Sequence, residues 1–323
     1  MKTVLITGCA GFIGFHLALN FNEKKFKVIG VDNLNDYYDL NLKKNRLKIL
    51  KKSKGNFLFK KIDLNQFQKL ENLFKKFNID YVINLAAQAG VRHSITNPKN
   101  YLDSNIVGFF NIIELSNKYK IQHFLSASTS SVYGAQENFP LREEYNTDKP
   151  LSFYAASKKT NEIIGYSFAN IHNLPVTFLR FFTVYGTYGR PDMSLFIFTK
   201  KILKNQYINL HNRGNHIRDF THVSDIVSAI IKITDRKPKY KIPYAVFNIG
   251  NNKPIALKYF LSLIEKYTNK KAKIKYIKMQ KGDVLKTHSS IAKLVKKINY
   301  RPKMNIEKGV KEFIDWYRKY YNL

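Results

Sequence analysis

The chain has 323 residues, enough for one large domain or two smaller ones with a buried core. Its hydrophobic content of 44% and charged content of 24% are typical of soluble globular proteins and unlike those of a disordered chain. A formal net charge of +32 would attract polyanions without regard to sequence. The lysines are spread along the whole chain, so we expect a solvated positive surface that favours an anionic substrate, and no specific nucleic-acid partner.

Three further features of the composition bear on location and metals. Cys9 is the only cysteine, so no internal disulfide can form and the cytoplasm is the expected compartment. The eight histidines form no ligand cluster, and we predict no metal site. Residues 3–22 carry no charge apart from one histidine, but glycines interrupt this apolar stretch. It is therefore expected to be neither a signal peptide nor a membrane span, and no membrane partner is predicted.

The first half of the chain alternates between short apolar runs and longer amphipathic stretches. This alternation predicts strands and helices in turn, and hence an α/β fold of the Rossmann type: a doubly wound parallel sheet covered by helices on both faces. The predicted strands are residues 4–6, 28–31, 57–59, 81–85, 123–125 and 176–180. The predicted helices are residues 12–22, 40–50, 66–77, 101–117 and 154–170.

After residue 182 the pattern becomes irregular. Helices are predicted over residues 223–234, 257–267 and 306–320, while residues 246–249 resemble one more strand of the main sheet. We therefore predict a dinucleotide-binding domain over residues 1–182, to which residues 221–250 return. A smaller, mixed, C-terminal substrate domain is predicted over residues 183–323, interleaved with the first.

A glycine-rich loop follows the first predicted strand and opens the first helix. Gly8, Gly11 and Gly14 allow a tight turn, close approach of backbone N–H groups to a pyrophosphate, and close packing of helix on strand. A turn of this kind can also be purely structural. Its position between strand and helix favours a cofactor site to which Phe12 and Ile13 also belong.

Asp32 ends the second predicted strand. An acid there hydrogen-bonds the ribose hydroxyls of NAD and repels the extra phosphate of NADP, so NAD is the predicted cofactor. The alternative is an aspartate that only caps a helix or turn. Asp63, after the third strand, is the natural contact for adenine. Further cofactor contacts are predicted at Asn33, Leu64, Leu85, Ala86 and Ala87.

The catalytic candidates are a tyrosine and a lysine one helical turn apart, Tyr154 and Lys158. The same spacing occurs at residues 145/149 and 267/271, so spacing alone is weak. Only Tyr154 lies in a predicted helix that follows a hydroxyl-rich loop, residues 128–134. That loop ends the fifth strand, where open parallel sheets bind ligands. The alternative is a loop whose hydroxyls only satisfy its own backbone.

Proton transfer suits these residue types. A free tyrosine has a pKa near 10, and a nearby ammonium and a nicotinium ring both favour the phenolate. We therefore expect Lys158 to lower the pKa of Tyr154. Thr129 or Ser131 can hydrogen-bond the reacting sugar hydroxyl and relay its proton to Tyr154.

Together these residues resemble the extended short-chain dehydrogenase/reductase family, over nearly the whole chain. Longer runs are similar to the UDP-glucuronate 4-epimerases in particular. These runs are residues 35–39, 86–92, 179–186, 189–193 and 218–221. The resemblance implies tightly bound NAD, a UDP-sugar substrate, a role in polysaccharide biosynthesis, and a homodimer formed by the helices near residues 101–117 and 154–170.

The resemblance also implies roles for individual residues. Thr129 and Tyr154 match the catalytic hydroxyl and base, and Lys158 matches the lysine that binds the nicotinamide ribose. Arg92 and Arg190 are candidates for holding a uronate carboxylate or the diphosphate, with plain surface solvation as the alternative. The remaining predicted substrate contacts are Ser130, Ser131, Thr183, Arg218 and Asp283.

One departure from related enzymes concerns the reaction. Sugar-nucleotide 4,6-dehydratases carry Thr-Asp-Glu in the hydroxyl loop, and related decarboxylases carry Thr-Ser-Glu, whereas this loop has serine at positions 130 and 131. The usual acid of either reaction is absent, and epimerisation needs neither. A smaller departure is Lys281, where the family pattern has proline, so the nucleotide contacts there are less defined.

The resulting hypothesis is an NAD-dependent C4 epimerase that interconverts UDP-glucuronate and UDP-galacturonate through a 4-keto intermediate. The nearest alternative is a 4-epimerase of a neutral or N-acetylated UDP-hexose. A remote alternative is a non-catalytic NAD-binding module with affinity for polyanions.

Overall fold

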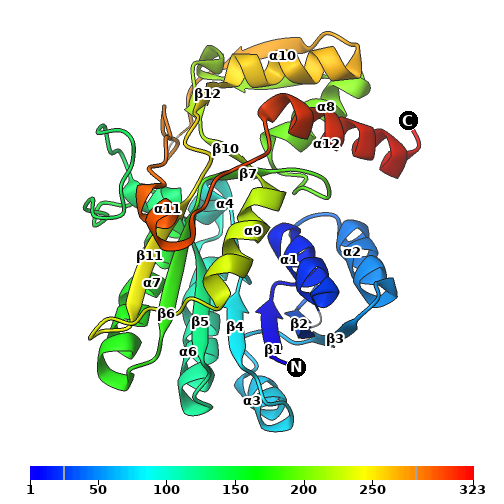
Figure 1. Cartoon of the computed structure of the whole chain (residues 1–323). Helices are drawn as coiled ribbons and strands as arrows, with labels where there is room; N and C mark the ends of the chain where they lie inside the picture. The colour runs from blue at the N-terminus through cyan, green and yellow to red at the C-terminus, as the bar shows by residue number, and fades with distance from the viewer. Residues whose placement is uncertain (25, 281) are drawn as a thin grey trace.

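The fold is built on one seven-stranded parallel sheet with the strand order β11-β6-β5-β4-β1-β2-β3 (Figure 1). The structure is a computed structural model that describes residues 1–24, 26–280 and 282–323. The departure noted at Lys281 lies outside these described residues. The strands are β1 (Thr3–Thr7), β2 (Lys27–Asp32), β3 (Asn56–Lys61), β4 (Tyr81–Asn84), β5 (His123–Thr129), β6 (Val176–Phe181) and β11 (Tyr244–Ile249).

Helices cover both faces of this sheet, because alternate side chains of each strand point to opposite faces. In β1, Val4 and Ile6 join one apolar core and Leu5 joins the other. The first core packs under α1 (Phe12–Glu23), α2 (Leu40–Lys52), α9 (Val223–Thr234) and α11 (Ala292–Ile298). The second packs under α3 (Phe67–Lys76), α6 (Gly108–Lys118) and α7 (Phe153–His172). Buried side chains on both faces explain why the strands read as continuous apolar runs.

The strand order reverses between β1 and β4, and this reversal positions the site. In such sheets a crevice opens at the carboxyl ends of the strands, where the connections on either side diverge to opposite faces. The glycine loop follows β1, residues 85–87 follow β4, and the hydroxyl loop follows β5. Sequence segments far apart in the chain therefore meet at one edge of the sheet.

A second, smaller layer lies above that edge at the top of Figure 1. Its core holds the stacked rings of Phe220 and Phe260, with centroids 4.0 Å apart. Its elements are β7 (Thr183–Tyr185), α8 (Ser194–Leu203), β8 (Tyr207–His211), η3 (Asn212–Gly214), β9 (Ile217–Arg218), β10 (Phe220–His222), β12 (Ile255–Ala256), α10 (Leu257–Thr268), β13 (Lys273–Ile277) and α12 (Ile306–Tyr321).

The predicted parallel sheet is confirmed, including residues 246–249 as part of β11, its strand next to β6. Among the described α-helices, α8, α11 and the short α4 (Val91–Thr96) were not predicted. Leu294 and Ile298 of α11 pack into the core that also holds α9, although both lie within the predicted substrate-domain range. The division into residues 1–182 and 183–323 remains a prediction.

The predicted helix 101–117 is interrupted. It consists of α5 (Pro98–Tyr101), a π-helical turn η1 (Leu102–Val107) and α6. Within η1, the buried Asn105 accepts a hydrogen bond from the backbone N–H of Gln88 at 2.7 Å and donates to Ser157 Oγ at 2.9 Å. Asn105 thus links the segment after β4 to the helix that carries Tyr154. Such π turns frequently occur at functional sites.

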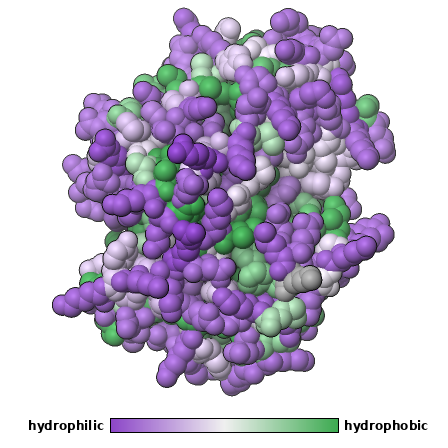
Figure 2. All heavy atoms as spheres, in the orientation of Figure 1, coloured by the Kyte–Doolittle hydropathy of each residue, from purple (hydrophilic) through white to green (hydrophobic). Residues whose placement is uncertain are grey.

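Hydrophilic side chains cover most of the face shown in Figure 2, and hydrophobic ones gather near its middle. This distribution accords with 55 Lys and Arg residues against 23 Asp and Glu. Among the described residues, no helix is long and apolar enough to span a membrane.

Candidate active site

A cavity of about 1370 Å³ lies between the carboxyl edge of the sheet and the smaller layer. All of the site residues predicted from the sequence line it, although they come from segments spread over most of the chain. They are Gly8, Gly11, Phe12, Ile13, Gly14, Asp32, Asn33, Asp63, Leu64, Leu85, Ala86, Ala87, Arg92, Thr129, Ser130, Ser131, Tyr154, Lys158, Thr183, Arg190, Arg218 and Asp283.

The glycine positions of the loop leave no room for a side chain. Gly8 has φ +68°, and a Cβ there would lie 2.8 Å from the backbone nitrogen of Ala86. A Cβ on Gly14 would lie 2.1 Å from the carbonyl oxygen of Gly8. The bare backbone borders the cavity at the N-terminus of α1, a favourable place for a phosphate group. These residues fit a dinucleotide pyrophosphate.

Asp32 is buried at the end of β2 and lines the cavity. Its carboxylate accepts hydrogen bonds from the backbone N–H of Ala10 at 3.0 Å and of Leu34 at 2.8 Å. Burial raises its pKa, although these two bonds and the nearby Lys43 oppose that shift. The two backbone bonds fix the carboxylate in place. Its contact with a ribose remains a prediction.

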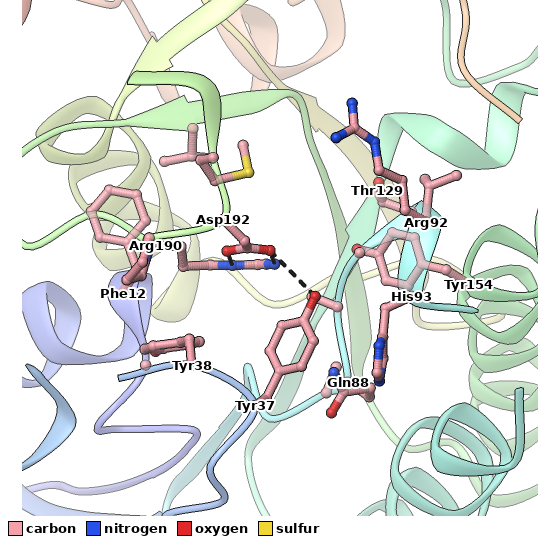
Figure 3. A pocket seen from close by; sticks show the side chains of 18 of the residues that line it. Phe12, Tyr37, Tyr38, Gln88, Arg92, His93, Thr129, Tyr154, Arg190 and Asp192 are labelled. Carbon is pink, nitrogen blue, oxygen red and sulfur yellow. Dashed lines mark hydrogen bonds and ion pairs between the residues drawn. The ribbon is translucent and has the colours of Figure 1, made fainter. Parts of the chain in front are cut away.

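The hydroxyl loop and the start of α7 lie next to each other on the cavity wall. Thr129 ends β5, and its hydroxyl donates to Ser131 Oγ at 3.2 Å while accepting from the Ser131 N–H at 3.2 Å. Tyr154 lies in the first turn of α7, where Ser152 Oγ caps the helix by accepting from the Ala155 N–H. In Figure 3 the Tyr154 ring points toward Thr129.

The electrostatics of the two catalytic candidates differ from expectation. Burial raises the pKa of Tyr154, while a hydrogen bond with Thr129 and the charge of Arg190 act to lower it. Burial lowers the pKa of Lys158 to about 8, opposed by the carboxylate of Glu162. In the free protein the desolvation of the phenolate dominates, so the expected lowered pKa of Tyr154 is not seen.

A buried ion pair holds α7 against the sheet. Glu162 lies one turn after Lys158, and its carboxylate accepts from Arg180 of β6 at 2.9 Å and 2.8 Å. The Ser128 hydroxyl donates to the same carboxylate at 2.6 Å. Both ionic side chains are at least 96% buried. This contact fixes α7 relative to the hydroxyl loop.

Arg190 is held by an acid of its own loop. Its Nε donates to Asp192 Oδ1 at 3.0 Å and its Nη2 to Oδ2 at 2.5 Å. The Tyr37 hydroxyl also donates to Asp192 at 3.3 Å, as the dashed line in Figure 3 shows. Arg92 is exposed at the rim of the cavity on α4 (Val91–Thr96). The two predicted arginines therefore have different surroundings, one pre-oriented and one solvated.

At the far end of the cavity, Arg218 of β9 is also engaged with protein groups. Its Nη2 donates to Asp283 Oδ1 at 2.8 Å and to the carbonyl of Val284 at 2.6 Å. Its Nη1 donates to the carbonyls of Ile217 and Leu285, each at 3.0 Å. Arg218 and Asp283 thus form one unit, and their contacts with a substrate remain a prediction.

Comparison with known proteins places the chain in a family. Residues 5–313 match the family model described as GDP-mannose 4,6 dehydratase. A curated UDP-glucuronate 4-epimerase from Thermodesulfobacterium geofontis is 42% identical, over 98% of this chain and 96% of its own. The chain belongs to the UDP-glucuronate 4-epimerase family. Protein CapI from Staphylococcus aureus is 47% identical to the chain, over 98% of this chain and 99% of its own.

The fold agrees with a solved epimerase structure. The UDP-glucuronic acid 4-epimerase from Bacillus cereus, solved in complex with UDP-glucuronic acid and NAD, superposes with a TM-score of 0.91. The match covers 99% of this chain and 100% of that one, at 29% sequence identity. The Rossmann-type fold expected for the family is therefore confirmed.

Among the described residues, no group of histidine, cysteine or acidic side chains is arranged to hold a metal ion.

Two side chains near the glycine loop, Lys43 and Arg46, were not predicted from the sequence as site residues. Lys43 is buried on the cavity wall, and its ammonium donates to the carbonyl and the side-chain oxygen of Asn35 at 2.7 Å and 2.6 Å. Arg46 is fully buried and connects three segments of the site.

Arg46 contacts the glycine loop and two neighbouring segments. Its Nη1 donates to the carbonyl of Ala10 at 2.8 Å and to the Tyr38 hydroxyl at 2.7 Å. Its Nη2 donates to the carbonyl of Tyr188 at 2.6 Å, next to the loop of Arg190. One guanidinium thus joins the glycine loop to the Arg190 loop. The nearest signal in the sequence was the family-like run 35–39, which gave no hint of a role for position 46.

Proposed function

We propose that the protein is an NAD-dependent C4 epimerase that interconverts UDP-glucuronate and UDP-galacturonate. The observation that carries this proposal is the meeting, in one cavity, of the glycine loop with Thr129, Tyr154 and Lys158. The hydroxyl loop presents serines at positions 130 and 131, where a dehydratase or decarboxylase of this kind needs a carboxylate. The family relatives named as UDP-glucuronate 4-epimerases support the same activity.

The cofactor site would be formed by the glycine loop and the acids after β2 and β3. Gly8, Gly11 and Gly14 would hold the pyrophosphate, Asp32 a ribose, and Asp63 the adenine side. Bound NAD⁺ supplies a reversible hydride acceptor, so that sugar oxidation and reduction need no other redox partner. Lys158 would hold the nicotinamide ribose through its ammonium.

The side-chain hydroxyls of Tyr154 and Thr129 would carry out the proton transfer at the sugar. Tyr154 would take the proton of the C4 hydroxyl and later return it, with Thr129 holding that hydroxyl in hydrogen-bond reach. Burial raises the pKa of Tyr154 in the free protein. The phenolate therefore requires positive charge nearby, which Lys158 and the bound nicotinium would supply.

The preference for a uronate would come from Arg190 and the two serines of the loop. Arg190 lines the cavity with its guanidinium already oriented by Asp192. A 4-ketone next to a C6 carboxylate makes a β-keto acid, which loses CO₂ readily. Ser130, Ser131 and Arg190 would hold the carboxylate so that it stays on the sugar. A solvated arginine at the rim, such as Arg92, is the weaker candidate for this role.

A homodimer is part of the proposal. The helices η1, α6 and α7 lie side by side, with Phe110 packing edge-on against Phe168. They expose large apolar side chains with exposed fractions between 42% and 68%, a pattern that marks an interaction surface. These side chains are Leu102, Val107, Phe110, Ile163, Tyr166 and Ile171.

We also propose that the enzyme acts in the cytoplasm and supplies a precursor for polysaccharide biosynthesis.

A product assay with several UDP-sugars tests the activity. The purified protein, saturated with NAD, is incubated with UDP-glucuronate, UDP-glucose and UDP-N-acetylglucosamine, and the products are resolved by chromatography. We expect UDP-galacturonate from the first and little change in the other two. Conversion of only the neutral sugars would favour the alternative substrate, and a pentose product would indicate decarboxylation. No conversion of any of the three would favour a binding module instead of an enzyme.

A further inference from the structure

A buried histidine without a hydrogen-bond partner lies at the far end of the cavity. His216 immediately precedes β9, its side chain is only 3% exposed, and it lines the cavity. Neither of its ring nitrogens has a hydrogen-bond partner among the described residues. Buried polar atoms in folded proteins are nearly always satisfied. An unsatisfied imidazole on a cavity wall therefore indicates a contact that forms only when a ligand is bound.

The surroundings of His216 show which donor remains for a ligand. The four Nη hydrogens of Arg218 are given to Asp283 and to backbone carbonyls, so only its Nε–H is left. Gln280 lines the same cavity, and its buried Oε1 also has no partner within the described residues. Hydrogen-bonding capacity is thus left over on Gln280, on the Arg218 Nε–H and on His216, and His216 is the buried ring with both nitrogens unsatisfied in that part of the chain.

The charges at this end favour an anion. Asp283 is the nearest acid, with Oδ2 3.6 Å from His216 Nε2, and its other oxygen is occupied by Arg218. Besides Arg218, the guanidinium of Arg92 acts on the charge of His216. These two arginines outnumber the one carboxylate near the ring, that of Asp283, so an anionic ligand group gains favourable interactions on entering.

We propose that His216 is a further substrate-binding residue, which donates an imidazole N–H to the diphosphate of the nucleotide sugar. The choice of a nucleotide sugar as ligand rests on the proposed function, whereas the anion-binding imidazole rests on the geometry above. The contact would complement Arg218, whose guanidinium is largely committed to holding Asp283. The contact would raise the affinity for the diphosphate and leave the affinity for the nucleoside unchanged.

The proposal implies that substrate binding takes up a proton. Burial and then the charge of Arg218 lower the pKa of His216, so the free ring is neutral near pH 7. A diphosphate beside the ring favours the imidazolium and raises its pKa in the complex. A group whose pKa rises on binding strengthens binding as the pH falls. Affinity should therefore increase from about pH 8 to about pH 6, the range in which histidines titrate.

The groups around His216 must be separated in any test of this pH dependence. Arg218 from β9, Asp283 from the loop after residue 281 and Arg92 from α4 act on its charge, as does His211 from β8. His211 also lines the cavity, with Nδ1 3.0 Å from the carbonyl of Lys278. A His211→Asn variant is therefore needed, because a second histidine could produce the same slope.

The test is calorimetric binding of UDP-glucuronate to NAD-loaded protein carrying Tyr154→Phe, which prevents turnover. The diphosphate of a nucleotide sugar is a diester without the second ionisation of a phosphate monoester near pH 6, so a slope belongs to the protein. His216→Phe should weaken binding about tenfold, the scale of one hydrogen bond to a charged group. His216→Gln keeps a donor and should bind nearly normally at about pH 8, without the pH dependence. His288 does not line the cavity, so His288→Asn should change neither the affinity nor its pH dependence.

Clear outcomes would overturn the proposal. Normal affinity in His216→Phe removes the contact, and a slope that disappears in His211→Asn but persists in His216→Gln assigns the proton to His211. Uridine is used as a phosphate-free competitor. If His216→Phe weakens uridine and UDP-glucuronate equally, the ring contacts the nucleoside and the diphosphate assignment is wrong. Binding needs no turnover, so a parent protein that binds UDP-glucuronate without epimerising it removes the proposed function and leaves the His216 test standing.

Discussion

Arg190 and Asp192, two residues apart on one loop, form a two-pronged ion pair at the wall of the cavity, with N–O distances of 3.0 Å and 2.5 Å. Tyr37 from the loop after β2 donates to the same carboxylate, so the pair also links that loop to the Arg190 loop. Within the described part of the chain, no acceptor is paired with Nη1 of Arg190. That edge of the guanidinium is available to a substrate.

This pair makes a specific prediction for Arg190→Ala. The variant should lose about 10²- to 10³-fold in kcat/KM for UDP-glucuronate, because the substrate carboxylate, buried on binding, would lose its charge partner, and such a loss typically costs about 3–5 kcal/mol. Asp192 would then also repel the substrate carboxylate. The double variant Arg190→Ala/Asp192→Ala should therefore regain part of the loss. An equal loss on UDP-glucose would instead assign Arg190 to the diphosphate.

Tyr154→Phe should lower turnover by roughly 10²-fold or more, the scale of a lost acid–base group. Its affinities for NAD and UDP-glucuronate should stay close to normal, because the ring remains and only the hydroxyl is removed. Steady-state kinetics and calorimetry measure the two effects separately. Near-normal turnover would remove Tyr154 from the mechanism.

Lys158 should determine the alkaline limb of the pH profile. Burial lowers its pKa to about 8. The ammonium, which favours the Tyr154 phenolate, is present below that value and lost above it. We expect kcat/KM to fall as the pH rises through about 8. Lys158→Arg keeps its charge throughout and should show no such limb, whatever its absolute rate. A limb that survives in this variant belongs to another group.

The same lowered pKa bears on stability. Between about pH 8 and pH 10 the folded state holds Lys158 neutral while the unfolded chain keeps it charged. The unfolded state then binds more protons, so the contribution of Lys158 to the free energy of unfolding rises with pH in this window. Denaturant titrations of the protein and of Lys158→Met, at several pH values, measure the difference in slope. Identical slopes would contradict the shift.

Glu162→Gln should destabilise the fold by about 3–5 kcal/mol, because it leaves Arg180 buried without its counter-charge. Thermal and urea unfolding measure this loss. Asp315→Asn is the matched control, since it breaks the exposed pair between Lys311 and Asp315 on α12. Exposed pairs contribute little, so no measurable change is expected there. Equal effects in the two variants would mean that Glu162 is not held as described.

The dimer prediction is tested by a charge on the exposed face of α7. Ile163 is 59% exposed, and Ile163→Glu should convert a dimer into a monomer in light scattering at micromolar concentration. Tyr207→Glu alters a residue that is 63% exposed on β8, away from α6 and α7, and should leave the dimer intact. A monomeric parent protein would contradict the proposal outright.

Local signals in the sequence determined the fold and most of the lining of the cavity. The parallel sheet could be predicted from the spacing of the apolar runs and from the glycines after β1. Both patterns reflect backbone geometry that neighbouring residues impose. Tyr154, Lys158 and Asp32 could be placed because strand ends and helix starts carry them. Lys43 and Arg46 could not be assigned to the site, because a cation on an amphipathic helix such as α2 is usually expected on its solvent-exposed face.

Tertiary structure alone decided the charges and contacts. Arg190 and Asp192 look like two independent surface residues in the sequence, and only the fold brings Tyr37 against their pair. The rise in the pKa of Tyr154 comes from desolvation, which depends on the surrounding atoms of several segments. The orphaned ring of His216 has the same origin: whether a polar atom finds a partner is settled by distant parts of the chain, and no local pattern records it.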